Sequence, residues 1–84
     1  MRYGGRFAFT DPREREYVWD ETATLDQLLI SQSKAVVAEG DVNIIDGSGC
    51  LWIVDLRNAP ELHLIVASYV DLLRRQIKKL LRSE

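Results

Sequence analysis

The hydrophobic pattern of the last third of the chain, from Asn58 to Arg82, predicts one long amphipathic helix. Steps of three and four residues place its apolar positions on one helix face: Leu62, Val66, Tyr69, Leu73, Ile77 and Leu80. The opposite stripe is polar and consists of Ser68, Asp71, Arg75, Lys78 and Arg82. Asn58 and Pro60 suit a helix start, because Asn can accept a first-turn N–H and Pro is tolerated there. Glu61, three residues after Asn58, completes a capping pattern.

This helix is wider in its apolar arc and longer than a small domain requires. Further apolar residues flank the main stripe: Leu64, Ile65, Val70, Leu72 and Leu81. A helix apolar over so much of its circumference is enclosed in a core or covered by a partner chain. With a length of roughly 35 Å, it is as long as a domain with a radius of gyration of about 12 Å, or overhangs it. We therefore expect self-association, as a homodimer, with partner contacts at Ile65, Tyr69, Leu72, Leu73 and Leu80.

The alternative is a core helix of a monomer with a frayed end. The chain has 84 residues, a size at which folding buries only a little over ~60% of the unfolded surface. Oligomerisation commonly supplies the stability that so small a core lacks. The length therefore favours self-association over the monomeric alternative.

The first twenty residues predict two paired strands. Residues 2–10 alternate with period two, which places on one face Tyr3, Gly5, Phe7 and Phe9. The segment 10–13 contains Asp-Pro, a turn signal. Tyr17-Val18-Trp19 has strand composition and is expected to pair back on the first strand.

The middle of the chain predicts a helix from Leu25 to Glu39. Thr24 and Gln27 form a capping box, and Gly40 supplies a stop. Helical spacing places these residues on one face: Leu25, Leu28, Leu29, Gln32, Ala35 and Val36. Two further apolar residues, Ile30 and Val37, fall off this face and indicate a second contact surface.

A hairpin follows. Residues 42–45 and 50–54 are apolar and flank Asp46-Gly47-Ser48-Gly49, a strong turn sequence. The uninterrupted apolar run 50–54 is typical of a central strand covered on both faces. Trp52 and Ile53 point to opposite faces, so a single layer of helices would leave one of them for a partner.

These elements predict an α+β fold in the order β-β-α-β-β-α. We expect a small two-layer domain that spans residues 1–84, with two helices on one side of an antiparallel sheet. No internal repeat or linker interrupts the chain.

Composition places the chain among small globular proteins. Hydrophobic residues make up 46% and charged residues 29%. No apolar run approaches the 18 or so residues that a membrane span needs, and the first residues lack the apolar core of a signal peptide. The single cysteine, Cys50, indicates a reducing compartment, so we expect a cytoplasmic protein.

Charge is distributed unevenly along the chain. From Arg74 onward the chain has five basic residues and one acidic residue, a net charge of +4. Because the whole chain has a net charge of −2, the rest of it has a net charge of −6. The alternative function is therefore a nucleic-acid or polyanion-binding module that uses Arg74, Arg75, Lys78, Lys79 and Arg82. Cations in the last turns of a helix also simply stabilise its dipole, and no aromatic residue follows Tyr69 to stack on bases.

No motif in the chain predicts catalysis, a cofactor or a metal. His63 and Cys50 are the sole residues of their kinds, and one Cys with one His cannot complete a zinc site. Cys50 heads an apolar strand, where a buried structural thiol is usual. The acidic residues that could bind a hard cation are scattered: Glu39, Asp41, Asp46 and Asp55. We expect a small non-catalytic interaction or regulatory protein; a ligand-binding fold or an enzyme would need a polar pocket between sheet and helices.

Overall fold

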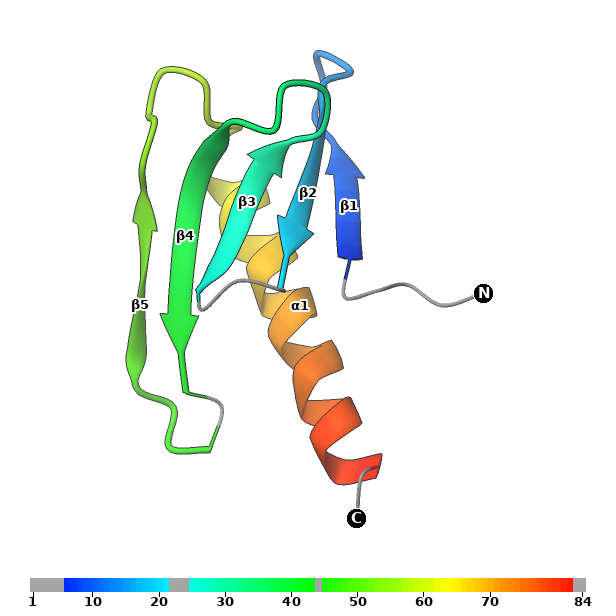
Figure 1. Ribbon diagram of the computed structural model, residues 1–84, viewed down its shortest axis with the longest axis vertical. Helices are drawn as coiled ribbons and strands as arrows, with labels where there is room; N and C mark the ends of the chain where they lie inside the picture. The colour runs from blue at the N-terminus through cyan, green and yellow to red at the C-terminus, as the bar shows by residue number, and fades with distance from the viewer. Residues whose placement is uncertain (1–5, 22–24, 44, 83–84) are drawn as a thin grey trace.

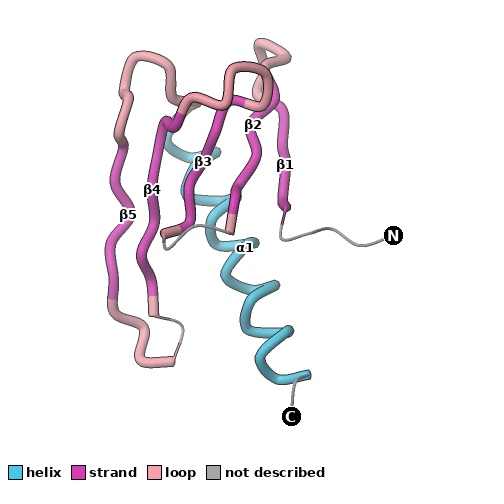
Figure 2. Tube along the Cα trace, viewed as in Figure 1, coloured by secondary structure: helices cyan, strands magenta, loops and turns pink. Residues whose placement is uncertain are grey.

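The computed structural model describes residues 6–21, 25–43 and 45–82. Five strands form one antiparallel sheet whose strand order follows the chain: β1 (Arg6–Thr10), β2 (Glu16–Asp20), β3 (Asp26–Ile30), β4 (Val36–Val42) and β5 (Gly49–Ile53). One helix, α1 (Leu62–Arg82), follows and crosses one face of this sheet (Figure 1). In the described parts of the chain no element covers the other face (Figure 2).

The α+β class holds, but the predicted β-β-α-β-β-α arrangement with two helices is wrong. The segment expected to be a helix, Leu25–Glu39, forms β3, a turn and most of β4. The turn is closed by hydrogen bonds from Lys34 N–H to the Ile30 carbonyl (2.7 Å) and from Ile30 N–H to the Ala35 carbonyl (2.9 Å). Lys34 adopts a left-handed backbone with φ of 66°. The capping residue of the expected helix, Thr24, lies outside the described residues.

Tertiary pairing explains why these residues form strands. Short apolar runs fit helix and strand periods equally well, so the pairing partners decide. β3 is central: Leu28 pairs with Trp19 of β2 and with Ala38 of β4. The adjacent valines, Val36 and Val37, are β-branched and suit a pleated surface better than a helix. A register shift at Leu28/Leu29 lets the bulged strand β4 bury Val37 completely.

The predicted pairing of the first two strands is confirmed. β1 pairs with β2 so that Phe7 opposes Trp19 and Phe9 opposes Tyr17. Residues 2–5 of the predicted first strand, which include Tyr3 and Gly5, lie outside the described residues. The turn between the strands is built on Asp11, whose Oδ1 accepts the N–H groups of Arg13 (3.0 Å) and Arg15 (2.9 Å).

The second hairpin is confirmed as a pairing of β4 with β5, but its details differ from prediction. β4 ends at Val42, and Ile45 is an exposed loop residue rather than a strand residue. β5 is an edge strand, so the expectation of a central strand covered on both faces is wrong. Its outward side chain Trp52 is 42% exposed. In the apolar run 50–54, Leu51 and Ile53 are therefore partly buried on one face of β5, and Trp52 is exposed on the other face.

The helix start and its core face also differ from prediction. Asn58 does not cap α1, because the helix begins only at Leu62. Its Nδ2 instead donates to Asp55 Oδ2 (2.9 Å) within the turn after β5. The buried helix residues are Ile65, Ser68, Tyr69 and Leu72. Ser68 had been assigned to the polar stripe. It is buried because its hydroxyl accepts a hydrogen bond from Trp19 Nε1 (2.9 Å) and donates to the Ile65 carbonyl (3.0 Å).

The core lies between α1 and the middle of the sheet. Tyr69 stacks on Trp19 with ring centroids 4.8 Å apart and rings inclined by 25°. The same ring lies on the backbone of Gly40 in β4, where a Cβ would overlap the ring atoms. Gly40 therefore permits the close approach of helix and sheet. The main core residues are Tyr17, Trp19, Leu28, Val37, Ala38, Ile65, Tyr69 and Leu72.

Gly40→Ala should destabilise the fold because the added methyl group displaces the Tyr69 ring. Overpacking of this kind costs about 1–3 kcal/mol. Urea unfolding followed by tryptophan fluorescence measures the change. Asp41→Ala, on the next and exposed position of β4, should change the free energy of unfolding by less than about 0.5 kcal/mol. Equal stability of Gly40→Ala and the unsubstituted chain would contradict this account of the contact.

Candidate interaction surface on the last helix

The predicted partner-binding residues divide into two groups. Ile65, Tyr69 and Leu72 are buried against the sheet of their own chain. They stabilise the protomer and present no surface to a partner. Leu73 is partly buried beside the core, and Leu80 is exposed. A partner surface on α1 must therefore be built from residues outside the buried face.

Such residues form a continuous row along α1. Four of them expose 40–44% of their surface: Val66, Val70, Ile77 and Leu80. With Leu73 they follow steps of four, three, four and three residues, the spacing of the contact positions in a coiled coil. We call Val66, Val70, Leu73, Ile77 and Leu80 the exposed seam. Leu62 and Leu81, at the ends of the helix, are exposed still further.

The sequence pattern located most of the seam but assigned it to the wrong environment. Val66, Leu73, Ile77 and Leu80 were expected to face the core, whereas the core face lies about a quarter turn away. Sequence reasoning did not include Val70 in this row. With Val70, the steps between successive seam residues alternate between four and three. A strict alternation of this kind indicates contact with another helix rather than with a sheet.

The seam lies on the side of α1 that faces β4 and β5. At one edge of the buried face of α1, Ser68 contacts β2 and the Arg75 guanidinium lies 5.3 Å from the centre of the Phe7 ring in β1. At the other edge of the buried face, Tyr69 reaches β3 and β4. Residues three and four apart are neighbours on a helix, so Val66 and Leu73 lie next to Tyr69. On this side three sheet residues are only partly buried: Val42, Leu51 and Ile53.

The C-terminal part of α1 extends past the ends of β1, β2 and β3 (Figures 1 and 2). It carries all five residues predicted to bind polyanions: Arg74, Arg75, Lys78, Lys79 and Arg82. Arg74 lies 3.7 Å from the Asp71 carboxylate in an exposed ion pair. These cations are thus grouped in the second half of α1, where Arg75 still lies over the Phe7 ring of β1.

A polar network fixes the middle of α1 to the sheet. The Tyr69 hydroxyl donates to Asp26 Oδ2 (3.0 Å). Gln76 Nε2 donates to Asp26 Oδ1 (3.3 Å) and to Glu21 Oε1 (3.0 Å). Partial burial raises the pKa of Asp26, and the charges of Glu21 and Asp41 add to the rise, although the hydrogen bonds from Tyr69 and Gln76 oppose it. Sequence reasoning missed this network because no local motif links its widely separated members.

The candidate catalytic and metal-binding residues do not converge. Cys50 is exposed rather than buried, and it alternates with the helix-facing Leu51, so it lies on the opposite face of β5. His63 is exposed in the first turn of α1, where its Nδ1 lies 3.6 Å from Glu61 Oε1. In residues 6–21, 25–43 and 45–82 no three His, Cys, Asp or Glu side chains lie together in a way that could hold a metal ion.

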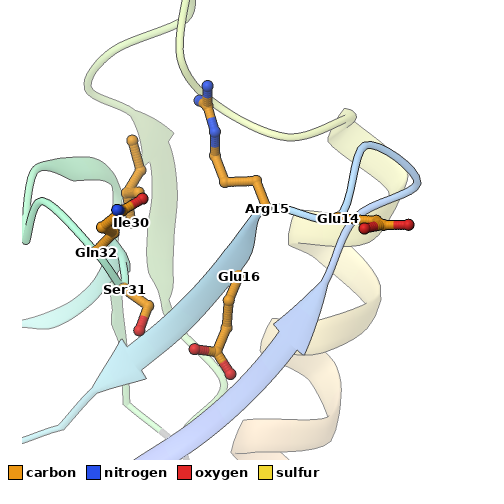
Figure 3. A pocket seen from close by; sticks show the side chains of 6 residues that line it. All are labelled: Glu14, Arg15, Glu16, Ile30, Ser31 and Gln32. Carbon is orange, nitrogen blue, oxygen red and sulfur yellow. The ribbon is translucent and has the colours of Figure 1, made fainter.

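A shallow hollow lies between the β1–β2 loop and the β3–β4 turn (Figure 3). Its volume is about 230 Å³, below the range of roughly 300–1,000 Å³ typical of ligand pockets. In Figure 3 the charged side chains of Glu14, Arg15 and Glu16 point in different directions. An adjoining hollow of about 320 Å³ shares Arg15, Ile30 and Gln32. In the first hollow the charged groups therefore do not converge on a point where a ligand would sit.

The raised pKa of Asp26 predicts a pH-dependent difference between the unsubstituted chain and Asp26→Asn. Between the unfolded and folded pKa values the folded state binds the extra proton, so stability of the unsubstituted chain falls as pH rises through this window. Asp26→Asn lacks this contribution. Urea unfolding across a pH series just above 3.8 should therefore show the stability of the unsubstituted chain falling relative to the variant. A pH-independent difference would mean that burial does not penalise this carboxylate.

Comparison of the chain with protein-family models, curated proteins and solved structures finds no match. Among the described residues, no helix has both the length and the apolar character that crossing a bilayer requires. The function is therefore inferred from the surface of the molecule, where the exposed seam is the most extended apolar feature on a regular element.

Proposed function

We propose that this is a small non-catalytic interaction protein that works as a homo-oligomer through α1. The observation that supports this proposal is the exposed seam. Scattered apolar residues are normal on protein surfaces, but a row of five on one helix flank is a typical docking surface. The heptad-like spacing matches what a second helix needs in order to pack side chains between those of α1.

The size of the chain supports the same proposal. A five-stranded sheet with one helix encloses a small core, and burial of the seam adds roughly 25 cal/mol of stabilisation for each Å² of apolar surface removed from water.

The proposed location is the cytoplasm. Cys50 is a free, exposed cysteine, and a free thiol suits a reducing compartment.

Ile77→Glu should dissociate the oligomer and leave the protomer folded. Ile77 is 40% exposed in the protomer, so a glutamate there stays hydrated in the monomer but is buried at the interface. We expect the dissociation constant to rise at least about 100-fold, which corresponds to about 2.8 kcal/mol. Sedimentation equilibrium measures the mass, and circular dichroism checks that the fold is retained.

The matched control is Leu56→Glu, the same change at an exposed loop residue away from the seam. It should leave the mass in solution unchanged. A monomeric unsubstituted chain at micromolar concentration would contradict the proposed function. An oligomer that both glutamate variants leave intact would show that self-association uses another surface.

Binding of nucleic acid or another polyanion is the second candidate function. The observation in its favour is the grouping of five cations in the second half of α1. The rest of the chain is acidic and would repel phosphates at other points of its surface. A polyanion would therefore contact this helix end alone, and its affinity would depend strongly on salt.

The double variant Lys78→Glu/Arg82→Glu tests this second function. Binding of a fluorescent DNA duplex should weaken at least about tenfold, and the dependence of affinity on salt should become shallower because fewer counterions are released. The control is Lys34→Glu/Arg57→Glu, which makes the same change in net charge at exposed loop positions. Equal binding by the two double variants, or binding that salt does not affect, would exclude a specific basic site on α1.

A further inference from the structure

We infer that the partner on the exposed seam is a second copy whose α1 lies antiparallel to the first, centred near Leu73. This inference rests on the proposed function and specifies its geometry. In this arrangement Val66 of each copy opposes Leu80 of the other, and the two Leu73 side chains meet at the two-fold axis. The projecting half of each helix then covers the first half of the other.

The incomplete cover of the sheet supports this arrangement. Strands lie about 4.8 Å apart, so five strands span roughly 19 Å, whereas one helix with its side chains is about 10–12 Å wide. α1 lies over the middle of the sheet, where Ser68 bonds to β2 and Tyr69 reaches β3 and β4. The β4–β5 side is left with partly buried Val42, Leu51 and Ile53. A second helix beside the seam would lie over these three residues.

The composition of the projecting helix end fits this position. The last turns of α1 still carry exposed apolar side chains, with Ile77 and Leu80 in the seam and Leu81, 66% exposed, beside it. If this end of the helix only kept the protein in solution, it would not need exposed apolar side chains. In the antiparallel pair these side chains meet Leu62 and Val66, which are the exposed apolar residues of the first two turns.

Charge selects the antiparallel direction over the parallel one. The first half of α1 and the residue before it carry the acidic residues Glu61 and Asp71 and no Lys or Arg. The second half carries five basic residues and no acidic residue within the described helix: Arg74, Arg75, Lys78, Lys79 and Arg82. A parallel pair would place ten cations side by side, whereas an antiparallel pair places each basic half beside a half that has no Lys or Arg.

Disulfide cross-linking distinguishes the two directions. In a Cys50→Ser background, which removes the exposed native thiol, single cysteines are introduced as Val66→Cys, Leu73→Cys or Leu80→Cys. In the antiparallel pair the two copies of position 66 lie about 21 Å apart, far beyond the roughly 7 Å that a disulfide tolerates between Cα atoms. Leu73→Cys should cross-link with itself, and a mixture of Val66→Cys and Leu80→Cys should cross-link between the two variants.

The readout is non-reducing electrophoresis after mild oxidation, with the mass of each reduced variant measured by light scattering. Antiparallel pairing predicts at least tenfold more covalent dimer in the mixture of Val66→Cys and Leu80→Cys than in either variant alone. Efficient self-cross-linking of Val66→Cys and of Leu80→Cys would overturn the antiparallel arrangement and leave the proposed self-association through α1 intact. A monomeric mass would instead contradict the proposed function itself. A dimer that none of these cysteines cross-links would place the interface elsewhere, for example at the edge of β5, and overturn both.

Discussion

The structure depends on how closely α1 approaches the sheet at Tyr69. This side chain stacks on Trp19, lies on the bare backbone of Gly40 and donates its hydroxyl hydrogen bond to Asp26. Three strands, β2, β3 and β4, are thereby tied to one turn of the helix. Gly40 is essential to this arrangement because any side chain at its position would separate helix and sheet. The rotation of α1 about its own axis, and hence the position of its exposed side, follows from this contact.

Ser68 shows why that rotation was not evident from the sequence. A helical pattern ranks residues by polarity, and serine falls on the polar side. In the fold, however, the hydroxyl satisfies the indole N–H of Trp19, a buried donor that would otherwise lack a partner. The need to satisfy Trp19 draws Ser68 into the core and turns Val66, Ile77 and Leu80 outward. The helix itself was predictable from periodicity, whereas its orientation depended on a residue 49 positions away.

The middle of the chain was mispredicted for a related physical reason. Residues 25–39 satisfy helical spacing and even offer a capping sequence, but strand pairing with β2 on one side and β5 on the other decides their conformation. The β-branched pair Val36 and Val37 was the local signal for a strand. By contrast, the pairing of Phe7 and Phe9 with β2 was predictable, because strict alternation with a nearby Asp-Pro turn leaves few alternatives. From the sequence alone, the buried residues Ile65, Tyr69 and Leu72, which had been predicted to bind a partner, could not be told apart from the seam, because that distinction requires the rotation of α1 about its axis.

The loss of the second predicted helix bears directly on the proposed function. In the predicted fold two helices would have covered a sheet of four strands, and the exposed seam would have been an internal contact between the helices. With one helix, the same seam faces solvent beside the partly buried Val42, Leu51 and Ile53. In the proposed dimer, a helix from a second copy takes the position that the sequence pattern had assigned to Leu25–Glu39. In that dimer the basic residues of the second half of α1 would give the second helix a direction, which a purely apolar seam would not.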